Sequence, residues 1–336
     1  MDRTDRRGPA APERMKPRRL ARPQVVRVAA PGKVNLYLHI IGRRSDGYHL
    51  LDTLVAFTGL HDVLILRAAD ELSLVRSGPH AALLEGEADD LVLRAARALA
   101  TAAEVPEGVA IELEKRVPVA AGLGGGSADA AAALAGLCRL WGVDRGTLDL
   151  PAIALELGAD VPACLRGLAA FLGGIGEQVT PAVALPPAYL VLVQPPVPVP
   201  TAAVFNAYAR GAGAYAPRQR AWFETVPRDT FELAEMLGAR RNDLTDAAIA
   251  EAPMIAEVLA ALAEQPDCLL ARMTGSGATC FGLFASAPEA AAAAARLARA
   301  RADWWVCETP LMRDAAEVDR DGEGATIHFE RPDVLM

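Results

Sequence analysis

The stretch PVAAGLGGGSADAAAAL, Pro118 to Leu134, places four glycines within five positions and then runs directly into alanine. Glycine permits positive φ angles and lets the backbone approach a ligand closely. Alanine is the strongest helix former, and Ser127 is a suitable N-cap residue with Asp129 in the first turn behind it. The free N–H groups at such a helix start bind anions. The stretch therefore predicts a phosphate site in front of a helix over residues 127–141.

Two familiar phosphate motifs fit this stretch poorly. A P-loop places a lysine next to its Ser or Thr, and no lysine neighbours Ser127. A dinucleotide-binding fingerprint needs a second strand that ends in an acidic residue about 20 positions on. Asp144 lies at that distance, but it follows a predicted helix end and leads into another helix. A plain turn before a helix is the remaining simple interpretation, and four glycines are entropically unfavourable for a mere turn.

Length and charge narrow the class of protein. The chain has 336 residues, of which 52% are hydrophobic and 23% charged, so it can build two domains with separate cores. Its net charge of −8 argues against nucleic acid as a partner, since phosphate backbones need clustered Lys and Arg. No run of 18 apolar residues predicts a membrane span. We expect a small-molecule partner and a monomer or weak homodimer.

The N-terminal segment differs in composition from the rest of the chain. Residues 1–22 carry eight basic and three acidic side chains without apolar periodicity, so we expect a disordered basic tail, with Met15 as an alternative start. They lack the apolar core of a secretory signal. The five cysteines show no metal-ligand spacing and are interpreted as apolar side chains in a reducing cytoplasm. The histidines form no zinc motif.

Hydrophobic periodicity and turn residues predict an α+β fold rather than alternating strands and helices. We expect an N-terminal, phosphate-binding domain over residues 23–180 and a C-terminal domain over 181–336. In the C-terminal domain, residues 269–286 are expected to form a strand, a glycine turn and a second strand, followed by a final helix and strand. In the first domain, strands are predicted near 24–30, 34–41, 52–58, 109–119 and 169–183, a hairpin from 62–68 and 72–77, and helices over 89–105, 127–141 and 150–157.

Three motifs in the same order resemble the GHMP kinase superfamily. Pro118 to Ala128 match every fixed position of its ATP loop, P-x-x-x-G-L-G-S/G-S/G-S-A/S. APGKVNLYL, residues 30–38, is similar to its first motif, and MTGSGATCFGLF, residues 273–284, to its third. The resemblance implies a two-domain fold, with an N-terminal ribosomal-protein-S5-like domain and a C-terminal ferredoxin-like domain. It also implies ATP and Mg2+ as cofactors.

Four finer matches are similar to one branch of the superfamily: APGKVNLYLHIIGRRSDGYHLLDTL, LGADVPACLRGLAAFLGGIGE, PPVPVPTAAVF and RNDL. That branch phosphorylates the 2-hydroxyl of 4-diphosphocytidyl-2-C-methyl-D-erythritol in the non-mevalonate route to isoprenoids. Gly32 stands where alanine is more usual. The alternatives are another GHMP kinase of the homoserine or mevalonate type, or a catalytically silent protein that senses ATP.

The resemblance also implies roles for individual residues. Asp160 corresponds to the catalytic base and Lys33 to a lysine that pairs with it and stabilises the transferring phosphoryl group. Without the resemblance, Asp160 is interpreted as a helix-capping residue and Lys33 as a solvated side chain. The hydroxyl of Ser127 is expected to reach Mg2+. The implied ATP-binding residues are Pro118, Val119, Ala120, Ala121, Gly122, Leu123, Gly124, Gly125, Gly126, Ser127 and Ala128.

Substrate binding is assigned to five residues near the first motif and after the proline-rich segment. Tyr48 and Phe205 are expected to stack on both faces of a cytosine ring, although core packing is the simpler interpretation of each aromatic residue. Gly275 to Gly277 are expected to shape the pocket floor, and Asn242 and Asp243 to have structural, capping roles. The implied substrate-binding residues are Asn35, Tyr48, His49, Thr201 and Phe205.

Overall fold

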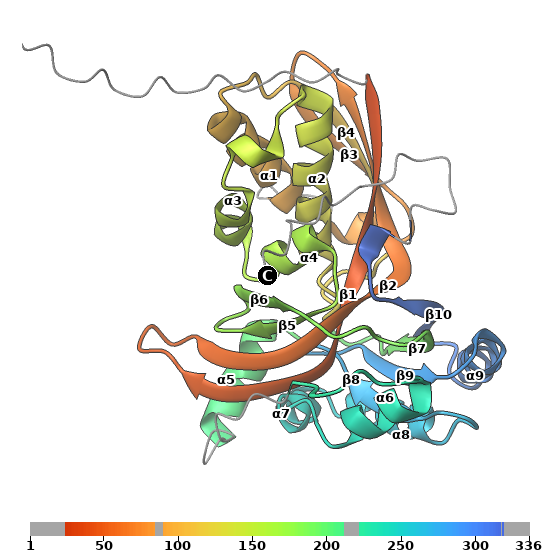
Figure 1. The fold of residues 1–336 in the computed structure, drawn as a ribbon. Coiled ribbons are helices and arrows are strands. Elements are labelled where there is room, and N and C mark those ends of the chain that lie inside the picture. The colour runs from red at the N-terminus through yellow and green to blue at the C-terminus, as the bar shows by residue number, and fades with distance from the viewer. Residues whose placement is uncertain (1–23, 85–89, 212–221, 317, 319–336) are drawn as a thin grey trace, which may run out of the picture.

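Two long antiparallel strands form the spine of the protein (Figure 1). The computed structural model describes residues 24–84, 90–211, 222–316 and 318, so the expected basic tail lies outside the described residues. Strands β1 (Val25–Arg43) and β2 (His49–Ala68) pair along their whole length. The sequence predicts two shorter strands in the range of each, and that prediction is wrong. The chain does not turn at Pro31 and Gly32: the pairing continues, and Gly32 faces a bulge on β2 formed by residues 58–60.

A single mixed sheet extends from this spine through both halves of the chain. Its order is β3-β4-β2-β10-β7-β9-β8, with β1 and β5 also on β2 and β6 on β5. The predicted hairpin of 62–68 with 72–77 is wrong, because β4 inserts between β2 and β3 and pairs with β3 in parallel. The remaining strands are β3 (Leu72–Ser77), β4 (Val109–Glu114), β5 (Ala170–Gly173), β6 (Gln178–Pro181), β7 (Ala188–Gln194), β8 (Leu270–Met273), β9 (Cys280–Phe284) and β10 (Trp305–Met312).

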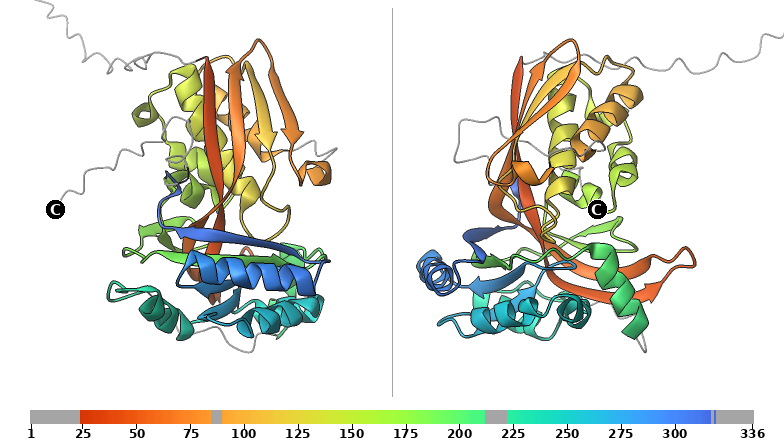
Figure 2. Two further views of the ribbon diagram at one scale, coloured as in Figure 1. Left: turned by 90° about the vertical axis from the view of Figure 1, so that its right-hand side faces the viewer. Right: turned by 180° about the vertical axis from the view of Figure 1, so that it is seen from behind.

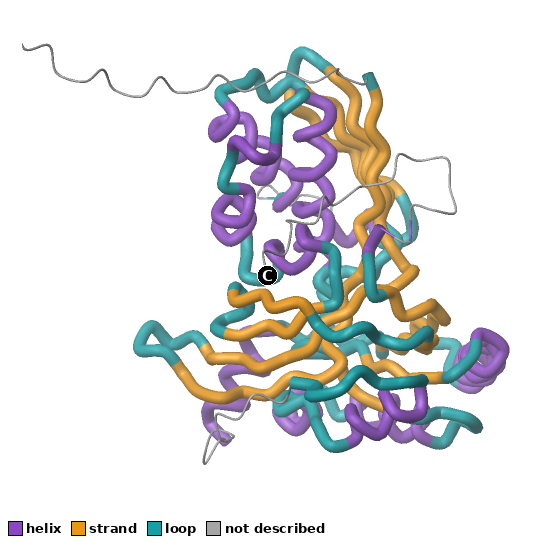
Figure 3. Tube along the Cα trace, viewed as in Figure 1, coloured by secondary structure: helices purple, strands orange, loops and turns teal. Residues whose placement is uncertain are grey.

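Helices cover the sheet in two groups, which confirms the two-domain α+β fold (Figure 2). The first group packs on the part of the sheet formed by β1 to β4, and the second lies against β7 to β10 (Figure 3). No helix in the described ranges is long and apolar enough to cross a membrane. The helices are α1 (Leu91–Ala103), α2 (Gly125–Trp141), α3 (Leu150–Leu157), α4 (Val161–Arg166), α5 (Thr201–Gly211), α6 (Thr230–Gly238), α7 (Thr245–Glu251), α8 (Met254–Ala263) and α9 (Ala287–Ala300).

The last strand joins the two halves. β10 pairs with β7 from Trp305 to Leu311 and reaches β2 through Leu311 and Met312. A strand near the C-terminus is thereby built into the sheet that carries the N-terminal spine. The proposed boundary near residue 180 thus separates the two groups of helices without separating two sheets.

Helix α2 is the central helix of the N-terminal half. Its small side chains let it lie directly on β1 and β2, and a Cβ at Gly136 would come within 2.5 Å of Leu66 Cδ1. The helix begins at Gly125, and its N-cap is Gly124 in the left-handed region, φ 63°. The prediction that Ser127 is the N-cap is therefore wrong. The helix starts two residues earlier because glycine takes the left-handed conformation that ends the loop.

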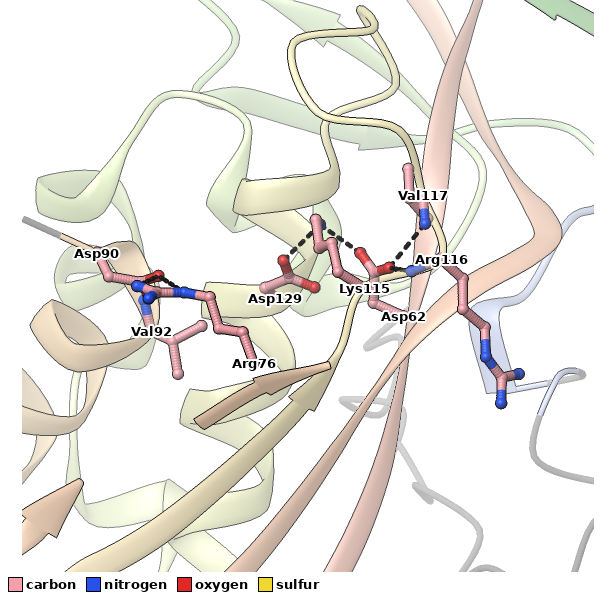
Figure 4. Close-up of polar contacts among 8 residues, drawn as sticks. All are labelled: Asp62, Arg76, Asp90, Val92, Lys115, Arg116, Val117 and Asp129. Atoms are coloured by element: carbon pink, nitrogen blue, oxygen red, sulfur yellow. Dashed lines mark hydrogen bonds and ion pairs between the residues drawn. The ribbon is translucent and has the colours of Figure 1, made fainter. Parts of the chain in front are cut away.

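A buried ion-pair cluster holds the start of this helix (Figure 4). Lys115 follows β4, and its Nζ lies 2.5 Å from Asp62 on β2 and 2.7 Å from Asp129 on α2. Asp62 Oδ1 also accepts from the backbone N–H groups of Arg116 and Val117. Asp129, predicted only as a first-turn acid, is buried, and burial raises its pKa well above the ordinary range despite Lys115. The cluster fixes the chain segment that leads into the glycine loop.

We predict that Lys115→Met lowers the free energy of unfolding by about 3–5 kcal/mol, because it leaves buried carboxylates without their cation. Urea unfolding of the protein without nucleotide measures this change. Arg67→Ala is the control: it removes an ion pair between neighbouring strands β2 and β4 that is exposed to solvent, and should cost less than about 1 kcal/mol. Equal stability of the two variants would contradict the assigned role.

Candidate active site

Three segments far apart in the sequence meet at the glycine loop. Gly122 has φ +73°, and a Cβ there would lie 2.8 Å from the carbonyl oxygen of Gly277 and 2.9 Å from that of Thr274. On the other side, the N–H of Lys33 donates to the carbonyl of Leu123 at 2.7 Å. The first, second and third sequence motifs are therefore in direct contact, and only glycine fits at position 122.

Two hollows lie on either side of this loop. The larger, here the cleft, has a volume of about 690 Å³ and contains the predicted catalytic and substrate-binding residues. The smaller, here the loop hollow, measures about 300 Å³ and lies between the loop, the start of α1 and Lys115. Gly122, Gly124 and Ser127 line both. Ligands in the two hollows would therefore meet at the start of α2.

Most of the predicted ATP-binding residues line the loop hollow. Leu123 and Ala128 do not: both side chains are buried in hydrophobic clusters, where they hold the loop and the helix in place. The positive φ angles lie at Ala120, Gly122 and Gly124, while Gly125 and Gly126 are helical. The residues of the predicted set that line the loop hollow are Pro118, Val119, Ala120, Ala121, Gly122, Gly124, Gly125, Gly126 and Ser127.

Lys33 and Asp160 form an ion pair in the cleft, 127 positions apart in the sequence. Lys33 Nζ lies 3.0 Å from Asp160 Oδ2 and 3.1 Å from Asn35 Oδ1. The Lys33 side chain is buried, whereas that of Asp160 is 38% exposed and open to a ligand. Asp160 precedes α4 but makes no side-chain capping bond, so the helix-cap interpretation is wrong. The geometry leaves the carboxylate available as a proton acceptor.

Asn35 is held by hydrogen bonds that could not be predicted from the sequence. Its side-chain amide donates to Thr53 Oγ1 at 2.9 Å, and its backbone N–H donates to Thr274 Oγ1 at 2.8 Å. Asn242 donates to the carbonyls of Met273 and Gly275, both at 2.8 Å, and so holds the third motif. The predicted structural role of Asn242 is confirmed. Helix α7 nevertheless begins without a side-chain cap.

The far end of the cleft is aromatic. His49 stacks on Phe205 with ring centroids 5.2 Å apart and an interplanar angle of 29°. No described group bonds His49 Nε2, and burial together with the nearby Arg43 charge lowers the pKa of this imidazole. The lowered pKa favours the neutral imidazole, which can exchange hydrogen bonds with a ligand. Tyr48 is 61% exposed at the rim, and its stacking opposite Phe205 remains a prediction.

Thr201 and the third motif complete the wall of the cleft. The hydroxyl groups of Thr201 and Ser276 lie 2.9 Å apart, which connects the start of α5 to the glycine turn. Gly275 and Ser276 line the cleft beside Lys33. Elements from both halves of the chain therefore enclose the same space.

Comparisons with known proteins agree with this geometry. The sequence pattern of the GHMP kinases N terminal domain matches residues 90–168, and that of the GHMP kinases C terminal region matches residues 227–303. The 4-diphosphocytidyl-2-C-methyl-D-erythritol kinase of Paramagnetospirillum magneticum is 53% identical over 85% of this chain and 98% of that protein. The kinase of the same name from Rhodospirillum rubrum is 49% identical over 86% of this chain and 94% of its own.

Comparison with solved structures gives one match that is also similar in sequence and others that are similar in fold alone. A crystal structure of 4-(cytidine 5'-diphospho)-2C-methyl-D-erythritol kinase superimposes with a TM-score of 0.68 at 36% identity, covering 85% of this chain and 99% of that one. Homoserine kinase from Cytophaga hutchinsonii has a TM-score of 0.63 at 17% identity over 88% of this chain and 98% of its own, and shares the fold. By sequence identity along most of its length, this chain belongs to the 4-diphosphocytidyl-2-C-methyl-D-erythritol kinases of the GHMP kinase superfamily.

Proposed function

We propose that this enzyme transfers the γ-phosphoryl group of ATP to the 2-hydroxyl of 4-diphosphocytidyl-2-C-methyl-D-erythritol, a step of non-mevalonate isoprenoid biosynthesis. The observation that carries the proposal is the Lys33–Asp160 pair, which stands in the cleft where that cleft meets the glycine loop. The loop hollow would hold ATP and the cleft the alcohol substrate. Phosphoryl transfer requires mainly positioning and charge neutralisation, which this arrangement offers.

The loop and the start of α2 would hold the phosphates of ATP. Gly122 and Gly124 turn the chain through left-handed conformations, and no side chain at those positions stands over the backbone. The first N–H groups of α2 have no partners within the helix and carry its positive dipole end. Lys115 beneath the loop keeps this cradle in place through Asp62 and Asp129.

Asp160 would accept the proton of the 2-hydroxyl as that oxygen attacks the γ-phosphorus. Its partial exposure allows a hydroxyl group to approach, and its ion pair with Lys33 holds the carboxylate in position. Lys33 would then balance the charge that develops between the attacking oxygen and the phosphoryl group. Asn35 and the Leu123 carbonyl hold Lys33 in this position.

The residues at the loop fit a magnesium ion that ATP itself brings. Within the described ranges no three His, Cys, Asp or Glu side chains form a metal cluster. Mg2+ in such kinases is held by few protein groups together with substrate phosphates, and it neutralises their charge. The Ser127 hydroxyl, which lines both hollows and does not cap α2, is the group we assign to it.

The aromatic end of the cleft would bind the cytosine. Stacking on an aromatic ring is worth about 1–3 kcal/mol per base, and Phe205 and Tyr48 both line the cleft. Neutral His49 would exchange hydrogen bonds with the base edge. An assay of ADP release with the cytidine substrate, homoserine, mevalonate and galactose tests the proposal. Turnover restricted to the cytidine substrate supports it, and turnover of none of the four would favour a silent ATP-binding protein.

We predict that Asp160→Asn lowers kcat by about 100-fold or more, since the amide cannot accept the proton. The KM for the cytidine substrate should change little, because the aromatic end is untouched. Lys33→Ala should behave alike, and the double variant should lose far less than the product of the two effects if the pair acts as a unit. Steady-state kinetics with both substrates varied measure this. A fully active Asp160→Asn enzyme would remove the carboxylate from the mechanism.

We predict that Gly122→Ala raises the dissociation constant of ATP about tenfold or more. A Cβ there meets two backbone carbonyl oxygens below 3.0 Å at a positive φ, so the loop must shift. The matched control is Gly238→Ala at the end of α6, where nothing lies within 4 Å of the added atom. Calorimetric titration with ATP compares the two. Unchanged affinity in Gly122→Ala would show that the loop does not form the ATP site.

A further inference from the structure

Arg43 stands at the aromatic end of the cleft. It is the last residue of β1 and lies directly opposite His49, the first residue of β2. Side chains of directly opposed residues in an antiparallel pair lie on the same face of the sheet. His49 faces the cleft, and Arg43 lines the same cleft. The positive charge of Arg43 also contributes to the lowered pKa of His49.

The guanidinium group of Arg43 is held in place but is not neutralised. Its Nε donates to the carbonyl of Gly47 at 3.0 Å, across the turn between the two strands. No carboxylate in the described part of the chain forms an ion pair with it. The neighbouring Arg44 differs, because it lies 2.7 Å from Asp46 in a solvent-exposed ion pair. One bond through Nε leaves the Nη groups of Arg43 to bind a ligand.

Among the charged side chains that line the cleft in the described part of the chain, one cation has no carboxylate partner. The ionised side chains that line it are Lys33, Arg43, Asp46 and Asp160. Lys33 is paired with Asp160, and Asp46 with Arg44. Among the described lining residues, Arg43 is therefore the cation whose charge awaits an anionic partner. The substrate of the proposed function carries a diphosphate next to its cytidine, with negative charge on both phosphates.

We propose that Arg43 binds the diphosphate of the nucleotide-linked substrate and thereby determines specificity for it. This inference rests on the proposed function. Arg presents a planar fork of donors that matches phosphate oxygens, and such charge-assisted bonds are stronger than neutral ones. The Gly47 carbonyl orients the side chain beforehand, so less conformational freedom is lost on binding. An alcohol without a diphosphate leaves this cation unmatched.

The experiment compares ligands with and without the diphosphate. Calorimetry measures the dissociation constants of cytidine and CDP for the wild type, Arg43→Gln and Arg44→Gln, with the loop hollow filled by a non-hydrolysable ATP analogue. In Arg43→Gln we expect the preference for CDP over cytidine to fall about tenfold or more, because a hydrogen bond to a charged group is lost. Cytidine affinity should stay within twofold. Arg44→Gln, which removes only an exposed pair, should keep the wild-type preference.

Kinetics provide a second readout. In Arg43→Gln the KM for the cytidine diphosphate substrate should rise about tenfold, while kcat and the KM for ATP stay unchanged. An unchanged preference for CDP, or equal weakening of CDP and cytidine, overturns the inference, since Arg43 would then only support the turn or His49. A wild type that binds CDP no better than cytidine overturns it too. Absence of turnover with the cytidine substrate contradicts the proposed function itself and is separate from these outcomes.

Discussion

The placement of one buried ammonium group governs the geometry of the ATP loop. Lys115 is 3% exposed and lies between two carboxylates that belong to β2 and α2. Asp62 also accepts the two backbone N–H groups that follow Lys115, so the chain is fixed just before Pro118. The sheet, the loop and the first turns of the helix are thereby joined at one point. The glycines beyond it can adopt left-handed conformations without losing their position relative to the sheet.

The position of the Lys33–Asp160 pair depends on irregularities in the pairing of the long strand β1 with β2. The pairing with β2 shifts between Pro31 and Lys33 and again between Asn35 and Tyr37. Bulges redirect side chains and are frequent beside active sites. Here the bulge lies where Lys33 donates its N–H to Leu123 of the loop and extends its side chain to Asp160. Because β1 pairs with β2 along one edge only, the N–H groups of Lys33 and Asn35 on its other edge are available to Leu123 and Thr274.

Local signals in the sequence predicted what depends on local chemistry. The alanine-rich run predicted α2, and the glycine-rich stretch predicted an anion cradle before it. Resemblance to known kinases added Lys33 and Asp160, which no spacing argument could bring together. Residues 62–68 and 72–77 looked like a hairpin because the insertion of β4 between them is a non-local pairing. The hydrogen bonds of Asn242 and Thr274 could not be predicted from the sequence for the same reason. They are non-local, and single polar residues give no periodic signal.

The fold by itself does not determine which alcohol is phosphorylated. Homoserine kinase and mevalonate kinase structures share the architecture at 17% and 15% identity, so the loop, the helix and the sheet accommodate substrates of different chemistry. Discrimination must then come from side chains that face the cleft outside the loop. Under the proposed function these side chains come from the turn between β1 and β2 and from α5, which meet where His49 stacks on Phe205. Both elements lie at the end of the cleft away from Asp160, so substrate recognition can change while the phosphoryl-transfer geometry stays the same.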